Sequence, residues 1–271
     1  MGNFISKPNT FHESKHLIVS LYIQGYNTFM TQASKIQISD TILLMDDFIL
    51  LVNKPAGMLT IRDGYNPNLP YLAQILANEF GPVWVVHRLD RDTSGILILA
   101  RTAQAHQNLS LQFEHHLIKK TYHAIATGVP DREHFIIERP LKVDGDRRHR
   151  TIVDEQNGKN ATTEFLVLEN YKKYCLIEAR PTTGYTHQIR VHLLAAGYPI
   201  LSDSLYQLKV KDSPGAPGSN TSIQEGSLIH RMALHARSIT FTHPLTGQLI
   251  EIEAPYPDDF ANAINHLRQQ N

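Results

Sequence analysis

Residues 83–100 read VWVVHRLDRDTSGILILA, in which a polar and charged run is enclosed by two apolar segments. Val83 to Val86 and Gly95 to Ala100 have the composition of buried strands, so the run from His87 to Ser94 is predicted to be the loop between them. Polar loops on a rigid scaffold often hold functional residues. The alternative is a solvated turn in which Asp and Ser side chains satisfy nearby backbone groups.

The segments around this loop predict further regular structure. Apolar residues at helical spacing predict a helix over Leu72 to Phe80 that stops at Gly81, and Ala103 to Phe113 has helical composition. A third helix is expected to be capped by Thr186 and to run to residues 196–197. Further strands are predicted at two apolar runs around Asp46-Asp47 within 42–52 and at 122–126, 162–168, 175–179, 238–242 and 249–253. Strands arrive in clusters without steady alternation with helices, which predicts an α+β fold around a mixed, mostly antiparallel sheet with flanking helices.

Composition limits the environment in which the protein works. No apolar run approaches the ~20 residues that a membrane-spanning helix needs, so no membrane contact is expected. The N-terminus lacks the pattern of a secretory signal, and the single cysteine, Cys175, excludes an intramolecular disulfide. Both features favour a cytoplasmic protein. Lys and Arg total 26 against 26 Asp and Glu, so binding of a nucleic acid would require a local basic patch.

Five further motifs accompany the His87–Gly95 segment in order along the chain. They are NKPAG at 53–57, KTY at 120–122, GKNATT at 158–163, TGYTHQIRVHL at 183–193 and HRMALHA at 230–236. Together with the His-Arg-Leu-Asp segment and the following Thr-Ser-Gly, they resemble the RluA-type pseudouridine synthases from about residue 42 to residue 257. The sequence departs from that family at Tyr185, where Arg is usual, and near Ser202 and Gln207, where Gly is usual.

The resemblance implies a pseudouridine synthase fold with a central RNA-binding cleft. It also implies an isomerase that acts on specific uridines of structured RNA, ribosomal or transfer, by flipping the target base. Residues 1–40 are expected to be an N-terminal extension without the S4-type module of many relatives, and 41–271 the catalytic domain. Residues 213–222, rich in Pro, Gly, Ser and Asn, are predicted to be a mobile surface loop.

Three residues receive catalytic roles from the resemblance. Asp90 is the essential carboxylate, Arg190 lies near it and favours its charged form, and Tyr122 lies against the target base. Judged without the motifs, Arg190 would be a surface residue on a helix and Tyr122 a core tyrosine with a hydrogen-bonded hydroxyl. The family pattern favours the catalytic assignments.

Six further residues are predicted to contact RNA: Arg88, His87, Lys54, Thr186, His187 and Gln188. Arg88 would occupy the vacated stack or hold a phosphate, and its alternative is a solvated Arg paired with Asp92. Basic residues at 119–120 and within 139–150 could supply a phosphate-binding face, although Asp144 and Asp146 dilute this cluster. A solvated charge cluster is an equally good interpretation of them.

Two other classes of function compete with this interpretation. His12-Glu13-Ser14-Lys15-His16 matches a zinc-protease pattern, but it lies at a polar terminus with no evident helix around it. A non-catalytic RNA-binding protein with the same fold would be favoured if Asp90 were replaced, and Asp90 is present. We therefore predict an active monomeric enzyme whose partner is RNA and which uses neither a metal nor an organic cofactor.

Overall fold

The computed structural model describes residues 37–208 and 228–271, which form a ten-stranded sheet, a small hairpin and four α-helices. The strands of the large sheet are β1 (Ile42–Met45), β2 (Ile49–Lys54), β3 (Trp84–Val85), β4 (Ser94–Ala100), β5 (Lys119–Thr127), β6 (His134–Glu138), β9 (Thr162–Asn170), β10 (Tyr174–Pro181), β11 (Leu234–Thr242) and β12 (Leu249–Glu253). The hairpin pairs β7 (Leu141–Lys142) with β8 (Ile152–Val153). A short 3₁₀-helix, η1 (Ile38–Thr41), precedes β1.

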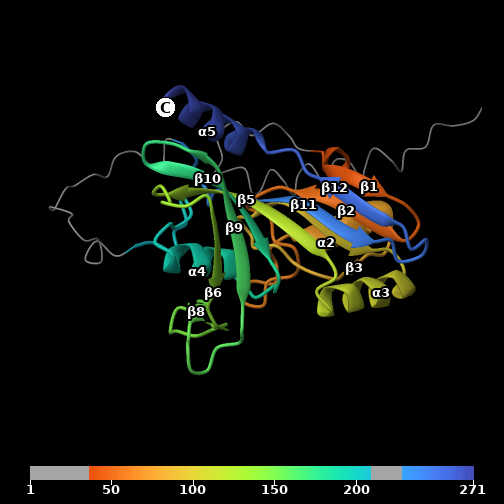
Figure 1. Cartoon of the computed structure of the whole chain (residues 1–271). Coiled ribbons are helices and arrows are strands. Elements are labelled where there is room, and N and C mark those ends of the chain that lie inside the picture. The colour runs from red at the N-terminus through yellow and green to blue at the C-terminus, as the bar shows by residue number, and fades with distance from the viewer. Residues whose placement is uncertain (1–36, 209–227) are drawn as a thin grey trace, which may run out of the picture.

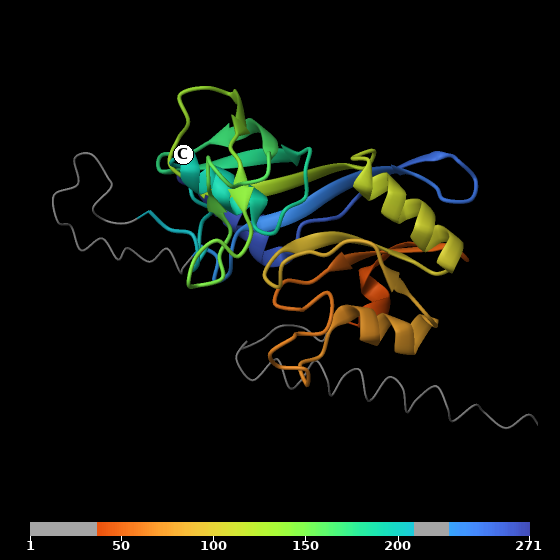
Figure 2. The ribbon, with the colours of Figure 1, turned by 90° about the horizontal axis from the view of Figure 1, so that it is seen from below.

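The large sheet is mixed and mostly antiparallel. Its strand order is β1-β2-β4-β11-β5-β10-β9-β6, with β12 paired to β11 and β3 to β4. The β4–β11 pair is parallel, whereas the other pairs of this sheet are antiparallel. Figure 2 shows the two flanks of the sheet, the β1–β2 side in orange and the β9–β10 side in green. The predicted α+β class and mixed sheet are confirmed.

The helices cover both faces of this sheet. They are α2 (Leu72–Phe80), α3 (Ala103–Glu114), α4 (Gln188–Ala195) and α5 (Asp258–Gln269). Figure 1 shows α5 above the sheet and α3 and α4 below it. Apolar side chains of α4 and α5 join those of β5 and β10 in the largest buried cluster of the described residues. Among these helices none is long and apolar enough to cross a membrane.

The parallel contact between β4 and β11 brings the central motifs together. Ser94 and Gly95 pair with His235 and Ala236. Gly95 has a positive φ of 111°, and a Cβ atom at this position would lie 2.2 Å from the Ala236 carbonyl oxygen. Only glycine permits so close an approach of two backbones. Ala236 also pairs with Tyr122 on β5, so one row across the sheet joins β4 to the predicted active-site tyrosine.

Most predicted elements are confirmed, and α2, α3, β4 and β12 agree within one residue at each end. The helix over Leu72 to Phe80 ends before Gly81 as expected, and Ala103 to Phe113 extends by one residue in α3. The sequence pattern missed β6, the β7–β8 hairpin and α5. The amphipathic spacing of α5, with Phe260, Ala263, Ile264 and Leu267 buried, was present in the sequence and could have revealed it.

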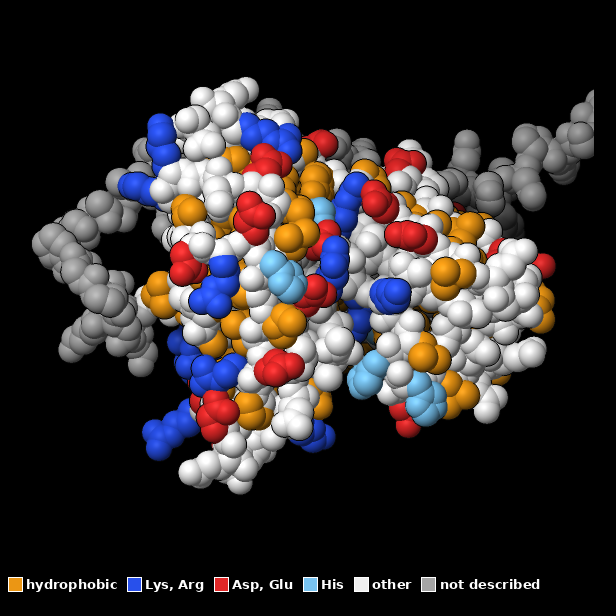
Figure 3. All heavy atoms as spheres, viewed as in Figure 1, with side chains coloured by type: hydrophobic (Ala, Val, Ile, Leu, Met, Phe, Trp, Pro, Cys, Tyr) orange, Lys and Arg blue, Asp and Glu red, His pale blue; other side chains and the backbone are white. Residues whose placement is uncertain are grey.

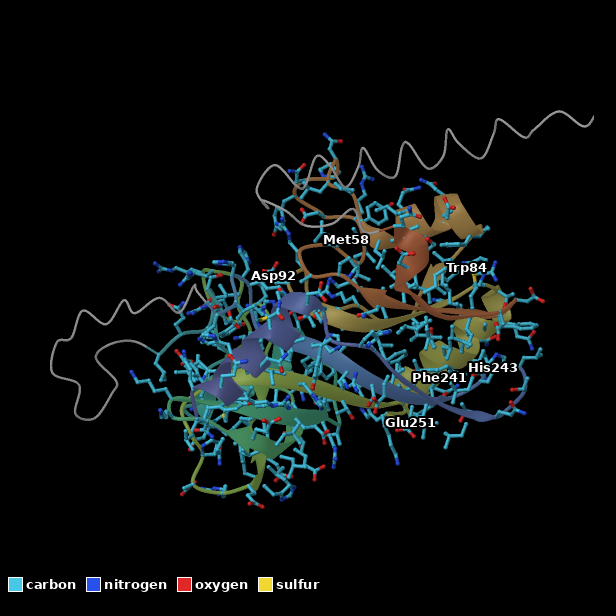
Figure 4. All side chains as sticks on the ribbon, turned by 90° about the horizontal axis from the view of Figure 1, so that it is seen from above. Met58, Trp84, Asp92, Phe241, His243 and Glu251 are labelled. Carbon is cyan, nitrogen blue, oxygen red and sulfur yellow. The ribbon has the colours of Figure 1, made fainter. Side chains whose placement is uncertain are left out.

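Two expectations about individual elements are wrong. The segment 83–86 does not form a buried strand: β3 has only two residues, and Trp84 lies at the surface, 38% exposed (Figure 4). The reason is that β11 leaves β4 after Gly95, and β3 pairs with the far end of β4 instead. The cap of α4 is His187 rather than Thr186, because His187 takes a left-handed backbone there and Thr186 bonds elsewhere.

The predicted mobile loop at 213–222 and the zinc-protease motif at 12–16 lie outside the described residues. Within 37–208 and 228–271, no group of three or more His, Cys, Asp and Glu side chains could hold a metal ion.

Candidate active site

A pocket opens where the loop before β4 faces the loop between β10 and α4. The first loop contributes Arg88 to Asp90 and Thr93, and β5 contributes Lys120 and Tyr122. The loop before α4 and the first turn of the helix supply the opposite wall, residues 183–190. With Leu234 of β11, the pocket therefore collects residues from four of the sequence motifs that lie far apart along the chain.

A fully buried lysine, Lys54, holds the first loop on the side away from the pocket. The Lys54 ammonium donates to the carbonyl oxygens of Pro55 at 2.9 Å, Met58 at 2.8 Å and Arg91 at 3.0 Å. These bonds tie the segment after β2 to the loop that carries Asp90, and Figure 4 places Met58 and Asp92 at this end of the sheet. Burial lowers the pKa of Lys54 to about 7, and the carboxylates of Asp92 and Asp90 oppose that shift.

The prediction that Lys54 contacts RNA is therefore wrong. Its side chain has no exposed surface, and all three of its donors are used by backbone carbonyls. Thr60 adds a second tie, because its hydroxyl donates to the Leu89 carbonyl at 2.9 Å and accepts from the Leu89 amide at 3.2 Å. The loop around Asp90 is thus fixed by buried polar groups on the side away from the pocket.

Asp90 is bound through one of its two carboxylate oxygens. The Arg190 Nη1 group donates to Asp90 Oδ2 at 3.1 Å. Oδ1 has no hydrogen-bond partner among the described residues. The side chain is 24% exposed and lines the pocket. One oxygen is therefore fixed in position while the other stays available to a bound molecule.

Arg190 is itself held by a second carboxylate that is buried. Its Nε and Nη2 groups donate to the two oxygens of Asp203 at 2.7 and 2.9 Å, a bidentate pair. Although burial opposes it, the hydrogen bonds and charges of Asp203 and Asp90 raise the pKa of Arg190. The guanidinium also lies 4.9 Å from the centre of the Tyr206 ring. These contacts fix a permanent positive charge beside Asp90.

Tyr206 connects this support to the β7–β8 hairpin. Its hydroxyl accepts from the Thr151 amide and donates to the Thr151 carbonyl, both at 3.0 Å. The Thr151 hydroxyl donates to the carbonyl of Thr186 at 2.7 Å. The hairpin is therefore packed against the loop that precedes α4, and it helps to shape the pocket wall.

Arg88 and His187 lie on the pocket side, as their predicted roles require. Arg88 is exposed, and its Nη2 group donates to the Thr186 hydroxyl at 3.1 Å. It does not pair with Asp92, the partner that the alternative interpretation assigned to it. His187 Nε2 lies 3.6 Å from Asp90 Oδ2. Contact of Arg88, Thr186 and His187 with RNA remains a prediction.

Tyr122 and Lys120 form the wall contributed by β5. Burial, with a smaller effect from the charge of Asp90, raises the pKa of Tyr122 well above its ordinary value. The phenol is therefore neutral at physiological pH, which favours a ring that contacts a base over a group that removes a proton. The Lys120 ammonium makes a single long bond of 3.4 Å to the Thr183 carbonyl within the described residues. It is available to a negatively charged ligand.

Two further residues predicted to bind RNA have structural positions instead. His87 Nε2 accepts from the Ile98 amide at 3.1 Å, its ring stacks on Phe113, and burial lowers its pKa to about 3. His87 does not line the pocket. Gln188 lines the pocket but is buried, and its amide bonds to groups of the protein itself: the Thr183 hydroxyl, the Tyr185 amide, the Thr162 carbonyl and the Thr163 hydroxyl.

The basic cluster within 139–150 is partly neutralised by its own neighbours. Arg150 pairs with Asp146 at 2.6 Å, and His149 bonds Asp144 at 2.6 Å. Figure 3 shows basic and acidic side chains interspersed on the part of the surface that projects around β8. This arrangement favours the solvated-cluster interpretation for Arg150 and leaves Arg147 and Arg148 exposed.

Sequence reasoning missed Asp203, Tyr206 and Thr151 as members of the site. One signal was available: the family usually has Gly near Ser202, and Ser202 here has a left-handed φ of 58°. A position that favours Gly indicates a turn with a positive φ. That turn directs Asp203, the next residue, into the buried space behind Arg190.

Comparison with known proteins identifies the family of this chain. Residues 48–195 match the model of the family described as RNA pseudouridylate synthase, and this range includes Asp90, Tyr122 and Arg190. Two solved human structures share the fold. RNA Pseudouridylate Synthase Domain Containing 4 has a TM-score of 0.69 at 21% identity and covers 95% of this chain and 98% of its own. RNA Pseudouridylate Synthase Domain Containing 1 has a TM-score of 0.66 at 24% identity, and the match covers 84% of this chain and 87% of its own.

Relatives of higher identity carry related names. Ribosomal large subunit pseudouridine synthase D of Neisseria meningitidis serogroup A is 36% identical over 84% of this chain and 61% of its own length. Uncharacterized RNA pseudouridine synthase YlyB of Bacillus subtilis is 34% identical over 83% of this chain and 71% of its own length. This chain thus spans about three fifths of the length of the Neisseria protein. With a family model that covers more than half of the chain and relatives above 30% identity, the chain belongs to the RNA pseudouridylate synthase family.

Proposed function

We propose that this chain isomerises uridine to pseudouridine in RNA, with Asp90 as the essential carboxylate. The observation that carries the proposal is the hydrogen bonding of the Asp90 carboxylate, which leaves one of its two oxygens available. Arg190 fixes Oδ2, and Oδ1 lacks a partner among the described residues, in a pocket that also contains Tyr122. Membership of the family supports the reaction class.

The chemistry suits a fixed and ionised carboxylate. Uracil N1 must leave ribose C1′, the base must turn, and its C5 must join the same C1′. The carboxylate can attack C1′, attack the uracil ring, or stabilise a positively charged sugar, and each route requires the ionised form. Arg190 places a positive charge beside this carboxylate. Tyr122 offers a flat neutral ring on which the base can lie.

Access to Asp90 requires that the nucleotide leave its stack. Unstacking a base costs a few kcal/mol, and groups that replace its contacts offset this cost. Arg88 and Lys120 are cations that line the pocket. We assign Arg88 to the vacated stack or a neighbouring phosphate, as its exposed position allows, and Lys120 to the phosphate backbone.

We propose ribosomal RNA of the large subunit as the substrate. The support comes from the printed names of relatives, among them synthase D of Neisseria meningitidis and synthase C of Buchnera aphidicola, which is 34% identical over 89% of this chain. We further propose that the enzyme acts as a monomer in the cytoplasm and needs neither a metal nor an organic cofactor, because the reaction is an isomerisation without redox change.

The test is tritium release from RNA that contains 5-tritiated uridine. We expect the wild-type chain to release tritium from large-subunit ribosomal RNA, and Asp90→Asn to retain the fold and RNA binding but to release none above background. Asp92→Asn is the matched control, because Asp92 lies two residues away and does not line the pocket. It should keep most of the activity. Normal turnover by Asp90→Asn would exclude the assignment, whereas RNA binding without turnover by the wild type would favour a non-catalytic RNA-binding protein.

A further inference from the structure

His187 occupies a constrained position next to Asp90. It precedes α4 with a left-handed backbone, φ 59°, which is uncommon for a residue other than glycine. Two edges of its imidazole meet polar groups of the site. Nδ1 lies 3.0 Å from the Tyr206 hydroxyl, and Nε2 lies 3.6 Å from Asp90 Oδ2. The ring thus connects the buried support of the site to the carboxylate.

The bonds of Tyr206 determine which ring nitrogen carries the proton. The single hydroxyl proton of Tyr206 is donated to the Thr151 carbonyl, so this oxygen acts as an acceptor toward its other neighbours. His187 Nδ1 must then donate to it. Nε2 is consequently the nitrogen that gains or loses a proton as the pH changes, and it is the nitrogen that faces Asp90.

The charges around the ring oppose one another. Burial lowers the pKa of His187, and the positive charges of Arg190 and Arg88 lower it further, whereas Asp90 and Asp203 raise it. The direction of the result is downward, so the ring is neutral at neutral pH and gains its proton at a lower pH than an ordinary histidine. A proton on Nε2 would face the carboxylate of Asp90, 3.6 Å away.

We propose that His187 is a positioning residue that controls how Asp90 is held, through the protonation of Nε2. In the neutral ring, Nε2 offers Asp90 Oδ2 no proton, so the carboxylate is bound by Arg190 alone and remains available to the nucleotide. In the charged ring, Nε2 forms a second ion pair with Oδ2 and withdraws negative charge from the carboxylate. Acidification therefore switches the site off. This inference rests on the proposed function.

Two variants separate the two edges of the imidazole. His187→Gln places an amide donor near the position of Nε2, where it can bond Asp90 at every pH. His187→Asn places its amide near the position of Nδ1, where it can bond Tyr206 but does not reach Asp90. Neither side chain titrates between pH 5 and 8.5. Thermal unfolding of both variants establishes that they fold.

The experiment measures the rate constant for pseudouridine formation at saturating RNA between pH 5 and 8.5. We expect the wild-type rate to fall on acidification in this range and the fall to be absent in both variants. His187→Gln should be slower than His187→Asn by about tenfold, the effect of one hydrogen bond to a charged group. An unchanged acidic limb in both variants, with equal losses at every pH, would show a merely structural role and overturn the proposal.

A second measurement is independent of activity. Nuclear magnetic resonance titration of the His187 ring in the full chain should give a lower pKa in Asp90→Asn than in the wild type, because Asp90 stabilises the charged ring. An unchanged His187 pKa would overturn the coupling. If the wild type formed no pseudouridine at any pH, the proposed function would fail, and this titration would still decide whether His187 and Asp90 are linked.

Discussion

Lys54, at the end of β2, and Lys120, near the start of β5, both lie close to the Asp90 loop, and burial lowers the pKa of each, yet their ammonium groups differ in hydrogen bonding. Lys54 is fully buried and donates to three backbone carbonyls. Lys120 lines the pocket and makes one long bond to a carbonyl. The region beneath the loop therefore uses its cation to hold the backbone, whereas the pocket wall presents its cation to a ligand.

The same contrast separates the two carboxylates that contact Arg190. Asp203 is buried and accepts two bonds from the guanidinium, and Asp90 is partly exposed and accepts one. The number of satisfied donors and acceptors, together with burial, distinguishes a group that maintains the structure from one that is available for chemistry. Residue type alone does not make this distinction.

The largest effect is expected at the buried support. Asp203→Ala removes the bidentate partner of a buried guanidinium and should lower the free energy of unfolding by roughly 3–5 kcal/mol. Asp259→Ala is the matched control: it breaks a bidentate pair with Arg231 in which the carboxylate is 44% exposed, and it should cost about 1 kcal/mol or less. Urea denaturation measures both. Equal losses would show that the buried and exposed carboxylates do not differ as described.

The next effect is expected at Lys54. Lys54→Met keeps the aliphatic part of the side chain but removes the donor to three carbonyls, and the Arg91 carbonyl alone keeps another bond, from the Gly57 amide. We expect the free energy of unfolding to fall by about 2–3 kcal/mol near neutral pH, since an unsatisfied buried polar group is costly. A loss smaller than about 0.5 kcal/mol would contradict the structural role that we assign to Lys54.

The pH dependence of this variant sharpens the comparison. The folded Lys54 has a pKa of about 7, and an unfolded lysine has a pKa of about 10.4. Between these values the unfolded state binds more protons, so the stability contributed by Lys54 rises with pH across this window. Denaturation of the wild type and Lys54→Met at pH 7, 8 and 9 should show the wild type gaining stability relative to the variant. A constant difference would indicate that native Lys54 keeps its proton.

The smallest effect on stability is expected at Lys120, where the effect on RNA should be clear. Lys120→Met should change the free energy of unfolding by less than about 1 kcal/mol, because it removes a single long bond. A phosphate contact that is lost should weaken RNA binding at every sequence and reduce the slope of log K against log salt by about one. Fluorescence anisotropy at several salt concentrations measures this slope. An unchanged slope would exclude a phosphate contact.

Local sequence patterns predicted much of the fold correctly. The helix at 72–80 was found because its apolar spacing and the following Gly81 are signals within a single segment. The two-residue strands β7 and β8 were missed because strands so short have no periodicity to detect. The strand expected over 83–86 was overestimated, since apolar composition cannot show that β11 diverges from β4 and leaves Trp84 at the surface.

The candidate site was predictable where a motif carried it. Asp90, Tyr122 and Arg190 were assigned from the family pattern, and the structure brings Asp90 and Arg190 together at 3.1 Å. His87 and Lys54 belong to the same motifs, and their environments separate them from the pocket. A motif records which residues are needed but not whether each one contacts the ligand or supports another residue.

The chain alone therefore determines the polar loop around Asp90, the order of the motifs and the α+β class, because these depend on residue types and spacings along the sequence. Packing alone decides which of those residues face the pocket. Asp203 and Tyr206 reach Arg190, and Thr151 reaches Tyr206, through contacts between separate loops. Such contacts depend on how the elements meet in space, and burial there shifts the pKa of groups such as Tyr122 and His187.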